Sequence, residues 1–504
     1  MRVSASIERF PATIKFVPQN RFEALVIRES SAQQFRLVCL TLSVFILASL
    51  AYGQATVSLS PGGGPPTSNV DVSGSGYTPY AQINIYFDVK QQGLAIADGT
   101  GSFSNVKIEA PRTAAPGKHW VSAVQQEGLT GAQAPFWVHT DWNQLGFDPA
   151  HTQENIYENQ LNRRTVKQLK LDWSYPSASG SPIVVNDQVY FGSGNSLYAL
   201  GGMNGQLLWQ YTSGGTVASP PAFAQGSVFF GSGDFNIYAL NAKTGTLEWK
   251  YATGSYVVSS PLVVNGVVYV ASDDNDVYAL NESDGTLLWK YATTAPVQFA
   301  PSFSNGVVYV PSSDGNIYAL NAADGNLDWK FMTTPTNNSS TPSVVNGVVY
   351  VASADANIYA LNASNGTLLW KTPVQAPADG STAAVADGMV FVGSGDAGIF
   401  YALSANTGSV RWKFKSTGAP VYSASAVANG VVYVGSGDQN FYALDTSSGA
   451  VLWKYTTAAY FPSAAVTNGR VYLSGDKFYV FKLPGEDTAP KAPGLGTLSS
   501  GSGG

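Results

Sequence analysis

Cysteine is nearly absent from this sequence: Cys39 is the only one in 504 residues. A single cysteine excludes an intramolecular disulfide and any metal or haem site built from several cysteines. Histidine is almost as scarce, and His119, His139 and His151 all precede the repeats described below. Neither a Ser-His-Asp triad nor a histidine-based metal site is therefore expected within those repeats.

Charged residues are also few, at 12% of the chain, and the formal net charge is −6. A chain with no excess of positive charge is not expected to bind nucleic acid or an acidic membrane surface. The abundant residues are instead the 52 glycines and 27 tyrosines. Together with the low charge, they favour an all-β protein with many turns.

Long apolar runs are limited to one, LVCLTLSVFILASLAYG at residues 37–53. It follows Arg36 and ends in small residues, which predicts a signal peptide within a leader of residues 1–54. We therefore expect the protein outside the cytoplasm, whether periplasmic, on the cell surface or secreted. An uncleaved membrane anchor is the alternative. Cys39 begins the run rather than ending it, which disfavours a lipoprotein anchor.

The C-terminal two thirds of the chain repeat at intervals of 36 to 42 residues. Each unit from residue 181 onward contains a β-branched hairpin, usually with Asn-Gly at its turn, then Tyr-Ala-Leu, then a tryptophan strand. Asn-Gly between such runs is a strong hairpin signal because both turn residues adopt positive φ. The tryptophans expected to dock one unit onto the next are Trp173, Trp209, Trp249, Trp289, Trp329, Trp370, Trp412 and Trp453.

Four short strands in a period of about 40 residues indicate a β-propeller blade. Seven units have all four strands, residues 462–483 have three without a tryptophan, and Trp173 begins no unit of its own. The two incomplete pieces predict an eighth blade formed by both chain ends, which leaves no open strand edge. Seven blades with a frayed end is the alternative.

Further segments surround the predicted propeller of residues 169–483. Residues 55–140 contain short alternating runs with Gly and Pro turns, which predict a small immunoglobulin-like β-sandwich. Residues 141–168 connect the two domains and contain a candidate short helix within residues 155–170. Residues 484–504 are rich in Pro, Gly and Ser and predict a disordered tail.

The motif that ends each unit, filled by Ala239, Asn241, Thr244, Gly245 and Trp249, resembles the tryptophan-docking motif of the quinoprotein alcohol dehydrogenase family. The resemblance covers about residues 157–483 and implies an eight-bladed propeller of PQQ-like repeats. It does not specify an activity.

In that family, PQQ lies under a disulfide between adjacent cysteines, and Glu, Asn and Asp side chains bind calcium. The predicted propeller has no cysteine, and its glutamates, Glu248 and Glu282, belong to turns or outer strands. PQQ and calcium are therefore disfavoured, and the chain is more similar to the non-catalytic propeller of the outer-membrane assembly lipoproteins. It differs from that branch in its N-terminal domain and in the position of its cysteine.

A carboxylate recurs in the turn after the second strand of each unit, often within Gly-Ser-Gly-Asp. The turn joins two strands and precedes no helix, so a phosphate loop is not expected. The simpler interpretation is that each side chain caps its own turn. An acidic ring for cations or a basic partner is the alternative. These residues are Asp234, Asp274, Asp314, Asp355, Asp396 and Asp438, with Asn195 in the first unit.

The loops that precede the inner strands differ most between units and should line the mouth of the central channel. Aromatic and amide side chains there suit a sugar, a quinone-like ring or a peptide, although they could also simply fill the channel. The candidate ligand-binding residues are Tyr256, Gln298, Phe299, Asn337, Asn338, Asp379, Tyr422, Tyr460 and Phe461.

The sequence thus favours a secreted or periplasmic, non-enzymatic binding or scaffold protein, monomeric, with an unidentified protein or glycan partner. Membrane contact is expected only through an uncleaved N-terminal segment. The alternatives are a PQQ-dependent dehydrogenase with an atypical site and a cell-surface adhesion or polysaccharide-binding protein. Each predicts a different ligand at the channel mouth.

Overall fold

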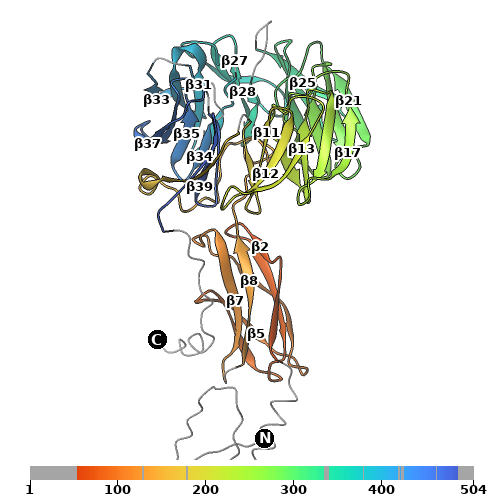
Figure 1. The fold of residues 1–504 in the computed structure, drawn as a ribbon, viewed down its shortest axis with the longest axis vertical. Helices are drawn as coiled ribbons and strands as arrows, with labels where there is room; N and C mark the ends of the chain where they lie inside the picture. The colour runs from red at the N-terminus through yellow and green to blue at the C-terminus, as the bar shows by residue number, and fades with distance from the viewer. Residues whose placement is uncertain are drawn as a thin grey trace, which may run out of the picture.

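The computed structural model describes residues 54–485, except 128–129, 178–179, 334–339, 379, 418–419, 422–424 and 461. The predicted signal segment and most of the predicted tail lie outside these residues. The described chain is all-β and forms an N-terminal domain below a ring of sheets (Figure 1).

The N-terminal domain consists of two sheets with a common core that includes Val70, Ile85, Val121 and Phe136. Alternating buried and exposed residues place one face of each sheet on this core. One sheet has the order β1(Thr56–Ser60), β3(Asn69–Ser75), β6(Phe103–Glu109), and the other β2(Gly63–Gly64), β8(Gly131–Val138), β7(Gly117–Gln125), β4(Gln82–Phe87), β5(Lys90–Ile96).

Seven antiparallel sheets follow, each of four consecutive strands (Figure 1). We number them blades 1 to 7 in chain order and give the strands of each blade from the inner strand outward. Their strands are β10(Ile183–Val185), β11(Gln188–Ser193), β12(Ser196–Gly201), β13(Leu207–Thr212); β14(Ala222–Ala224), β15(Ser227–Gly231), β16(Asn236–Asn241), β17(Leu247–Ala252); β18(Leu262–Val264), β19(Val267–Ala271), β20(Asp276–Asn281), β21(Leu287–Ala292); β22(Ser302–Ser304), β23(Val307–Pro311), β24(Asn316–Asn321), β25(Leu327–Met332); β26(Ser343–Val345), β27(Val348–Ser353), β28(Asn357–Asn362), β29(Leu368–Pro373); β30(Ala384–Ala386), β31(Met389–Ser394), β32(Ile399–Ser404), β33(Val410–Lys415); β34(Ala426–Ala428), β35(Val431–Gly435), β36(Asn440–Asp445) and β37(Val451–Thr456).

The eighth blade joins the two ends of the propeller. Its strands are β38(Ala464–Thr467), β39(Arg470–Ser474), β40(Phe478–Lys482) and, as the outer strand, β9(Lys170–Tyr175). Trp173 therefore has the place that the other tryptophans have in their blades, opposite Val480. The seven-bladed alternative does not hold, because β9 completes an eighth sheet.

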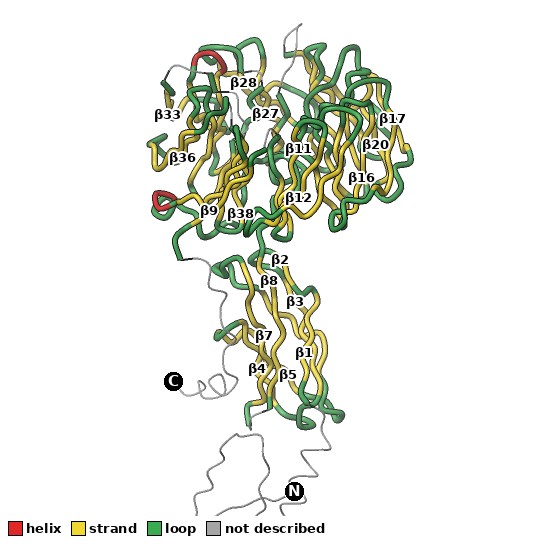
Figure 2. Tube along the Cα trace, in the orientation of Figure 1, coloured by secondary structure: helices red, strands yellow, loops and turns green. Residues whose placement is uncertain are grey.

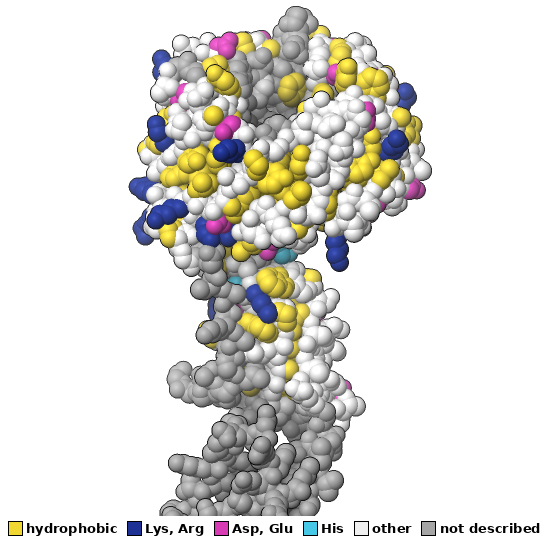
Figure 3. All heavy atoms as spheres, in the orientation of Figure 1, with side chains coloured by type: hydrophobic (Ala, Val, Ile, Leu, Met, Phe, Trp, Pro, Cys, Tyr) yellow, Lys and Arg dark blue, Asp and Glu magenta, His cyan; other side chains and the backbone are white. Residues whose placement is uncertain are grey.

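The first hairpin of each blade shows why Asn-Gly recurs. In blade 3, Asn265 and Gly266 have φ of 54° and 79°, the left-handed conformation that joins strands across a two-residue turn. The second and third strands are almost wholly buried between neighbouring blades, whereas the outer strands are partly exposed. Figure 3 shows hydrophobic side chains on this outer surface, between isolated Lys and Arg. The exposed leucines of the outer strands, each the first residue of its strand, include Leu207, Leu247, Leu287, Leu327 and Leu368.

The connector contradicts one prediction. Residues 155–170 form no α-helix, and the described segment has only a three-residue 3-10 helix, η1(Val166–Gln168) (Figure 2). The reason is local: the side chains of Asn155, Glu158 and Asn162 accept hydrogen bonds from nearby backbone N–H groups. Such side-chain acceptors compete with the helical backbone pattern.

Candidate functional site

The repeated tryptophan bonds its indole N–H to the next blade at seven junctions. Trp289 of blade 3 donates its indole N–H to the carbonyl of Ala322 in blade 4 at 2.9 Å. Its ring lies against Gly325, where an added Cβ would be 2.7 Å from the ring. The motif therefore has glycine because the preceding tryptophan fills the space of a side chain. Equivalent indole bonds come from Trp173, Trp209, Trp249, Trp329, Trp370 and Trp412.

A tyrosine on the second strand adds a second donor at four junctions. The Tyr269 hydroxyl donates to Ala322 at 3.1 Å, so one carbonyl of blade 4 accepts both Tyr269 and Trp289 of blade 3. Tyr190, Tyr309 and Tyr350 form the same arrangement at three more junctions. The shared carbonyl makes these contacts part of the ring's framework and leaves them unavailable to a ligand.

The recurrent turn carboxylates are likewise engaged within the fold. Asp314 accepts hydrogen bonds from the hydroxyls of Tyr318 and Thr294, both at 2.6 Å. Burial would raise the pKa of Asp314, but these and further hydrogen bonds outweigh it and lower the pKa to about 2. Asp234, Asp274, Asp355 and Asp438 bond the tyrosine four residues later in the same way. These contacts make turn capping the role that the structure displays.

The connector closes one end of the central channel. Thr140 donates its backbone N–H to Asn468 in the β38–β39 turn, and Asp141 accepts from Asn186 in the β10–β11 turn, so the connector enters on the side of the hairpin turns. Its next residues then bond the middle of an inner strand in every blade, in order. The pairs are Trp142 with Val184, Asn143 with Phe223, Gln144 with Val263, Pro149 with Phe303, Ala150 with Val344, Thr152 with Val385, Gln153 with Val427 and Asn155 with Val466.

Buried polar groups anchor this connector. The Glu158 carboxylate accepts the backbone N–H groups of Gln160, Leu161 and, from blade 8, Gly469. Its burial raises the pKa of Glu158, while these hydrogen bonds act in the opposite direction. His151 is also buried, and desolvation lowers its pKa to about 3, so it is neutral at physiological pH.

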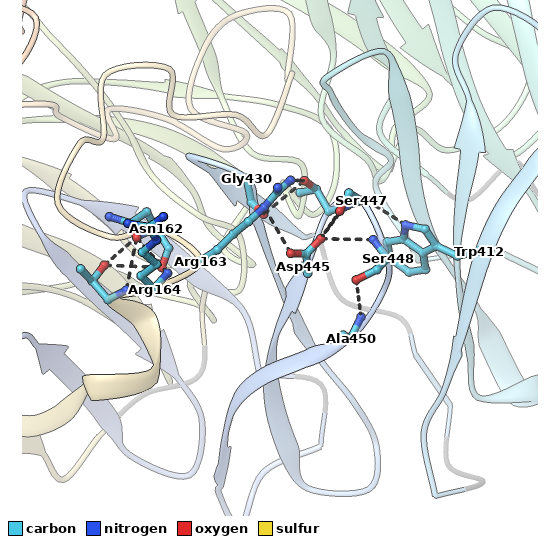
Figure 4. A network of polar contacts seen from close by, with 11 residues as sticks. Asn162, Arg163, Arg164, Trp412, Gly430, Asp445, Ser447, Ser448 and Ala450 are labelled. Atoms are coloured by element: carbon cyan, nitrogen blue, oxygen red, sulfur yellow. Dashed lines mark hydrogen bonds and ion pairs between the residues drawn. The ribbon is translucent and has the colours of Figure 1, made fainter.

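Arg163 attaches the end of the connector to blade 7, as Figure 4 shows. Its guanidinium donates to the Gly430 carbonyl at 3.1 Å and lies 3.2 Å from the Asp445 carboxylate. Sequence reasoning treated residues 141–168 as a simple linker and missed this role. The signal available was the density of Asn, Gln, Thr and Glu in a segment with a single Gly and a single Pro.

The opposite end of the channel, which we call the mouth, contains the predicted ligand-binding residues. It comprises the loops before the inner strands and the turns between second and third strands. Tyr256 and Tyr460 are 52% and 67% exposed there, Gln298 is exposed and Phe299 is half-buried. The remaining candidates, Asn337, Asn338, Asp379, Tyr422 and Phe461, lie outside the described residues. Their role stays a prediction.

Two mouth residues were missed by sequence reasoning. Phe235 lies in the β15–β16 turn, with its ring centroid 5.0 Å from that of Tyr256. Asp273 lies in the β19–β20 turn and donates its backbone N–H to the Tyr256 carbonyl at 2.9 Å. Both are departures from the repeat: the corresponding residues of blade 4 are Gly315 and Ser313. Aligning the turns by position would have found them.

The two glutamates of the propeller lie away from the mouth. Glu248 bonds Ser227 and Asn241 at the edge of blade 2, and Glu282 follows β20 on the hairpin-turn side, so neither reaches the mouth. Within the described residues, no three His, Cys, Asp or Glu side chains are placed to share a metal ion. The same part of the chain has no helix long and apolar enough to cross a membrane.

A family model described as outer membrane protein assembly factor BamB matches residues 159–264, 193–354, 254–384 and 355–489. These stretches overlap and together cover more than half of the chain. No match was found among curated protein sequences.

Several solved structures have a similar fold. Quinohemoprotein alcohol dehydrogenase ADHIIG from Pseudomonas putida HK5 is 16% identical, with a TM-score of 0.60 over 70% of this chain and 82% of that one. BamB from Moraxella catarrhalis is 19% identical, with a TM-score of 0.54 over 62% and 99%. The computationally designed Ika8 protein is 16% identical, with a TM-score of 0.56 over 62% and 98%. At these identities the likeness shows the fold alone.

Proposed function

The chain belongs to the family of BamB-type repeat β-propellers, and from this premise we propose that it is a non-enzymatic binding or scaffold protein whose partner binds at the propeller mouth. The observation that carries the proposal is the exposure of Tyr256, Phe235 and Tyr460 there. Large exposed aromatic side chains are typical of recognition surfaces. The connector occupies the other end of the channel, which leaves the mouth as the side for a ligand.

The same fold occurs with unrelated functions, so the function has to be inferred from the residues of the site. Similar propellers occur in proteins named as dehydrogenases, as an assembly factor and as a computational design. In this chain most of the repeated Trp, Tyr and Asp side chains form contacts between blades or within turns. The residues that differ between blades at the mouth are the ones left to select a partner.

The proposal places the protein outside the cytoplasm, periplasmic, cell-surface or secreted, with the N-terminal domain as an immunoglobulin-like spacer. The apolar run at residues 37–53 and the family of envelope proteins support this location. The spacer role is supported by Asn159 of the connector, whose amide donates to the carbonyls of Arg112 and Ala114 in the N-terminal domain. This contact joins the two domains beyond the chain connection itself.

The test is binding of the purified full-chain protein to peptide and glycan arrays. The double variant Tyr256→Ser/Tyr460→Ser should lose the ligands that the unchanged protein retains. Leu287→Ser is the matched control, because Leu287 is comparably exposed on an outer strand. Loss of binding in Leu287→Ser alone, or no ligand on either array, would contradict the proposal.

The glycan array also tests the adhesion alternative, since selective binding of a polysaccharide at the mouth would favour it. For the dehydrogenase alternative, PQQ and calcium are added to the full-chain protein. We expect neither dye reduction with an alcohol nor a rise in the unfolding temperature. Either response would restore the enzymatic hypothesis.

A further inference from the structure

Phe235 and Tyr256 form an aromatic corner between blades 2 and 3. Their ring planes meet at 82°, and both side chains remain substantially exposed, at 41% and 52%. The Tyr256 ring also lies over the backbone of Gly233, where an added Cβ would be 3.6 Å from the ring. The two rings meet edge to face, and parts of both stay open to solvent.

The backbone at Phe235 is unfavourable for this residue type. Its φ is 71°, in the left-handed region that bulky side chains rarely occupy. Four other blades have Asn275, Gly315, Ala356 or Gln439 at this turn position, also with positive φ. The left-handed conformation thus belongs to the repeated turn, and blade 2 differs in the side chain that it places there. The aromatic ring is therefore retained where smaller or more permissive residues fit the same turn.

The backbone of an acidic residue is bonded to this corner. Asp273 is tied to Tyr256 through its backbone N–H, and its Oδ1 atom is buried with no hydrogen-bond partner among the described residues. Blades 2, 4 and 7 have Gly233, Ser313 and Gly437 at this position. The charge is thus specific to blade 3. A negative charge at this place in the mouth favours a cationic ligand over an anionic one.

The surrounding charges are also predominantly negative. Asp234 flanks Phe235, and although burial raises its pKa, hydrogen bonds from Tyr238, Asn236 and Gly214 lower the pKa below its usual value. Asp274 follows Asp273 in the chain. The nearby Lys290 is already paired with Asp276 at 2.8 Å. A positive ligand would meet complementary charge here.

The chain already combines these groups elsewhere. In blade 5, the Lys371 ammonium lies 5.1 Å from the centre of the Tyr359 ring and 3.7 Å from the Asp355 carboxylate. A cation over an aromatic face gains from the ring quadrupole, and more so when it is removed from water. Blades 2 and 3 present rings and a carboxylate at the mouth without such a lysine in contact with Asp273.

We propose that Phe235, Tyr256 and Asp273 bind a lysine or arginine side chain of a basic polypeptide segment. The rings would contact the cation and its alkyl stem, and the negative charge of Asp273 would attract it. The exposed rings and the negative charges around them favour a cation over a neutral sugar. This inference rests on the proposed binding role of the mouth and specifies its partner.

The probe is a fluorescent octalysine peptide, with its fully acetylated form and an octaglutamate peptide as comparisons, titrated into full-chain protein. We expect octalysine alone to bind, with affinity falling as salt is raised. Asp273→Ser should weaken binding several-fold, because it removes one negative charge beside the rings. Phe235→Asn should weaken it several-fold.

Both substitutions introduce residues that sister blades have at the same positions, and thermal unfolding checks that each variant folds. The control is Asp284→Ser, which removes one exposed negative charge from the β20–β21 turn, on the hairpin-turn side. Equal weakening in Asp284→Ser, no weakening in Asp273→Ser, or equal binding of acetylated octalysine would overturn the inference. If Tyr256→Ser/Tyr460→Ser abolishes array binding but Asp273→Ser does not affect octalysine, the mouth remains the binding surface and only the cationic partner is wrong.

Discussion

The junctions among the first six blades differ from those where the two ends of the propeller meet. The difference shows which contacts a repeated sequence can provide and which it cannot. Within the array, from blade 1 to blade 6, four tyrosines donate to the same carbonyl as their blade's tryptophan. At the seam, where blades 7, 8 and 1 meet, Tyr433 and Tyr472 are buried with hydroxyls that have no partner among the described residues. There the connector contributes Glu158 and Arg163 instead. The seam therefore keeps the indole bond of Trp173 but not the tyrosine bond of the repeat.

The largest expected loss of stability comes from removing the tryptophan at one junction between blades. Trp289→Ala should lower the free energy of unfolding by about 4 kcal/mol, because it removes a buried ring and leaves Ala322 with one donor fewer. Urea denaturation followed by circular dichroism measures it. Trp137→Ala is the control, since Trp137 is half-exposed on β8 of the N-terminal domain and should cost less than about 1 kcal/mol. Similar losses in both variants would mean that docking does not hold the ring.

A second substitution separates backbone strain from ring contact. Gly325→Ala should destabilise the propeller by about 3 kcal/mol, because its Cβ would strike the Trp289 ring and its φ is 74°. Gly306→Ala has a similar φ of 82° but nothing within 4 Å of the added Cβ, so about 1 kcal/mol is expected. Equal losses in the same denaturation experiment would assign the glycine to turn conformation alone.

The third prediction compares the change in stability when a tyrosine hydroxyl is removed within the array and at the seam. Tyr309→Phe should cost about 1 kcal/mol, because a hydroxyl that donates to Ala363 is lost. Tyr433→Phe should be neutral or stabilising, because it removes a buried hydroxyl without a partner. Thermal unfolding of the two variants side by side measures the difference. A clear loss in Tyr433→Phe would show that the seam tyrosine is satisfied after all.

The smallest effect concerns acid. The folded-state pKa of Asp314 is about 2, below its ordinary 3.8, so its stabilising contribution is present above about pH 4 and is lost as the pH falls towards 2. Asp314→Asn should therefore reduce the fall in stability between pH 6 and pH 2.5. Asp328→Asn, on the exposed outer strand β25, is the comparison. An unchanged pH profile in Asp314→Asn would mean that turn capping adds no stability in blade 4.

Most of the fold could be predicted because the blades pack against one another through the same residue types at the same positions. The unmatched Trp173 indicated the eighth blade, and the structure places it on β9 beside β40. The mouth was predicted only in part. Tyr256 was identified from its loop, whereas its neighbour Phe235 is about twenty residues away in the chain and belongs to another blade. The candidate short helix is reduced to the 3-10 helix η1, because Asn155 and Glu158 accept backbone N–H groups two and three residues later in the chain.

The sequence by itself determined the all-β architecture, the period of the blades and the residues that each junction repeats. It could do so because these contacts recur at a fixed spacing, so the residues of one unit indicate the packing of the equivalent residues in the others. Only the tertiary structure decided the path of residues 140–158 across eight inner strands and the meeting of Phe235, Tyr256 and Asp273. Those contacts occur once, between segments whose proximity depends on closure of the whole ring, and no repeated spacing records them.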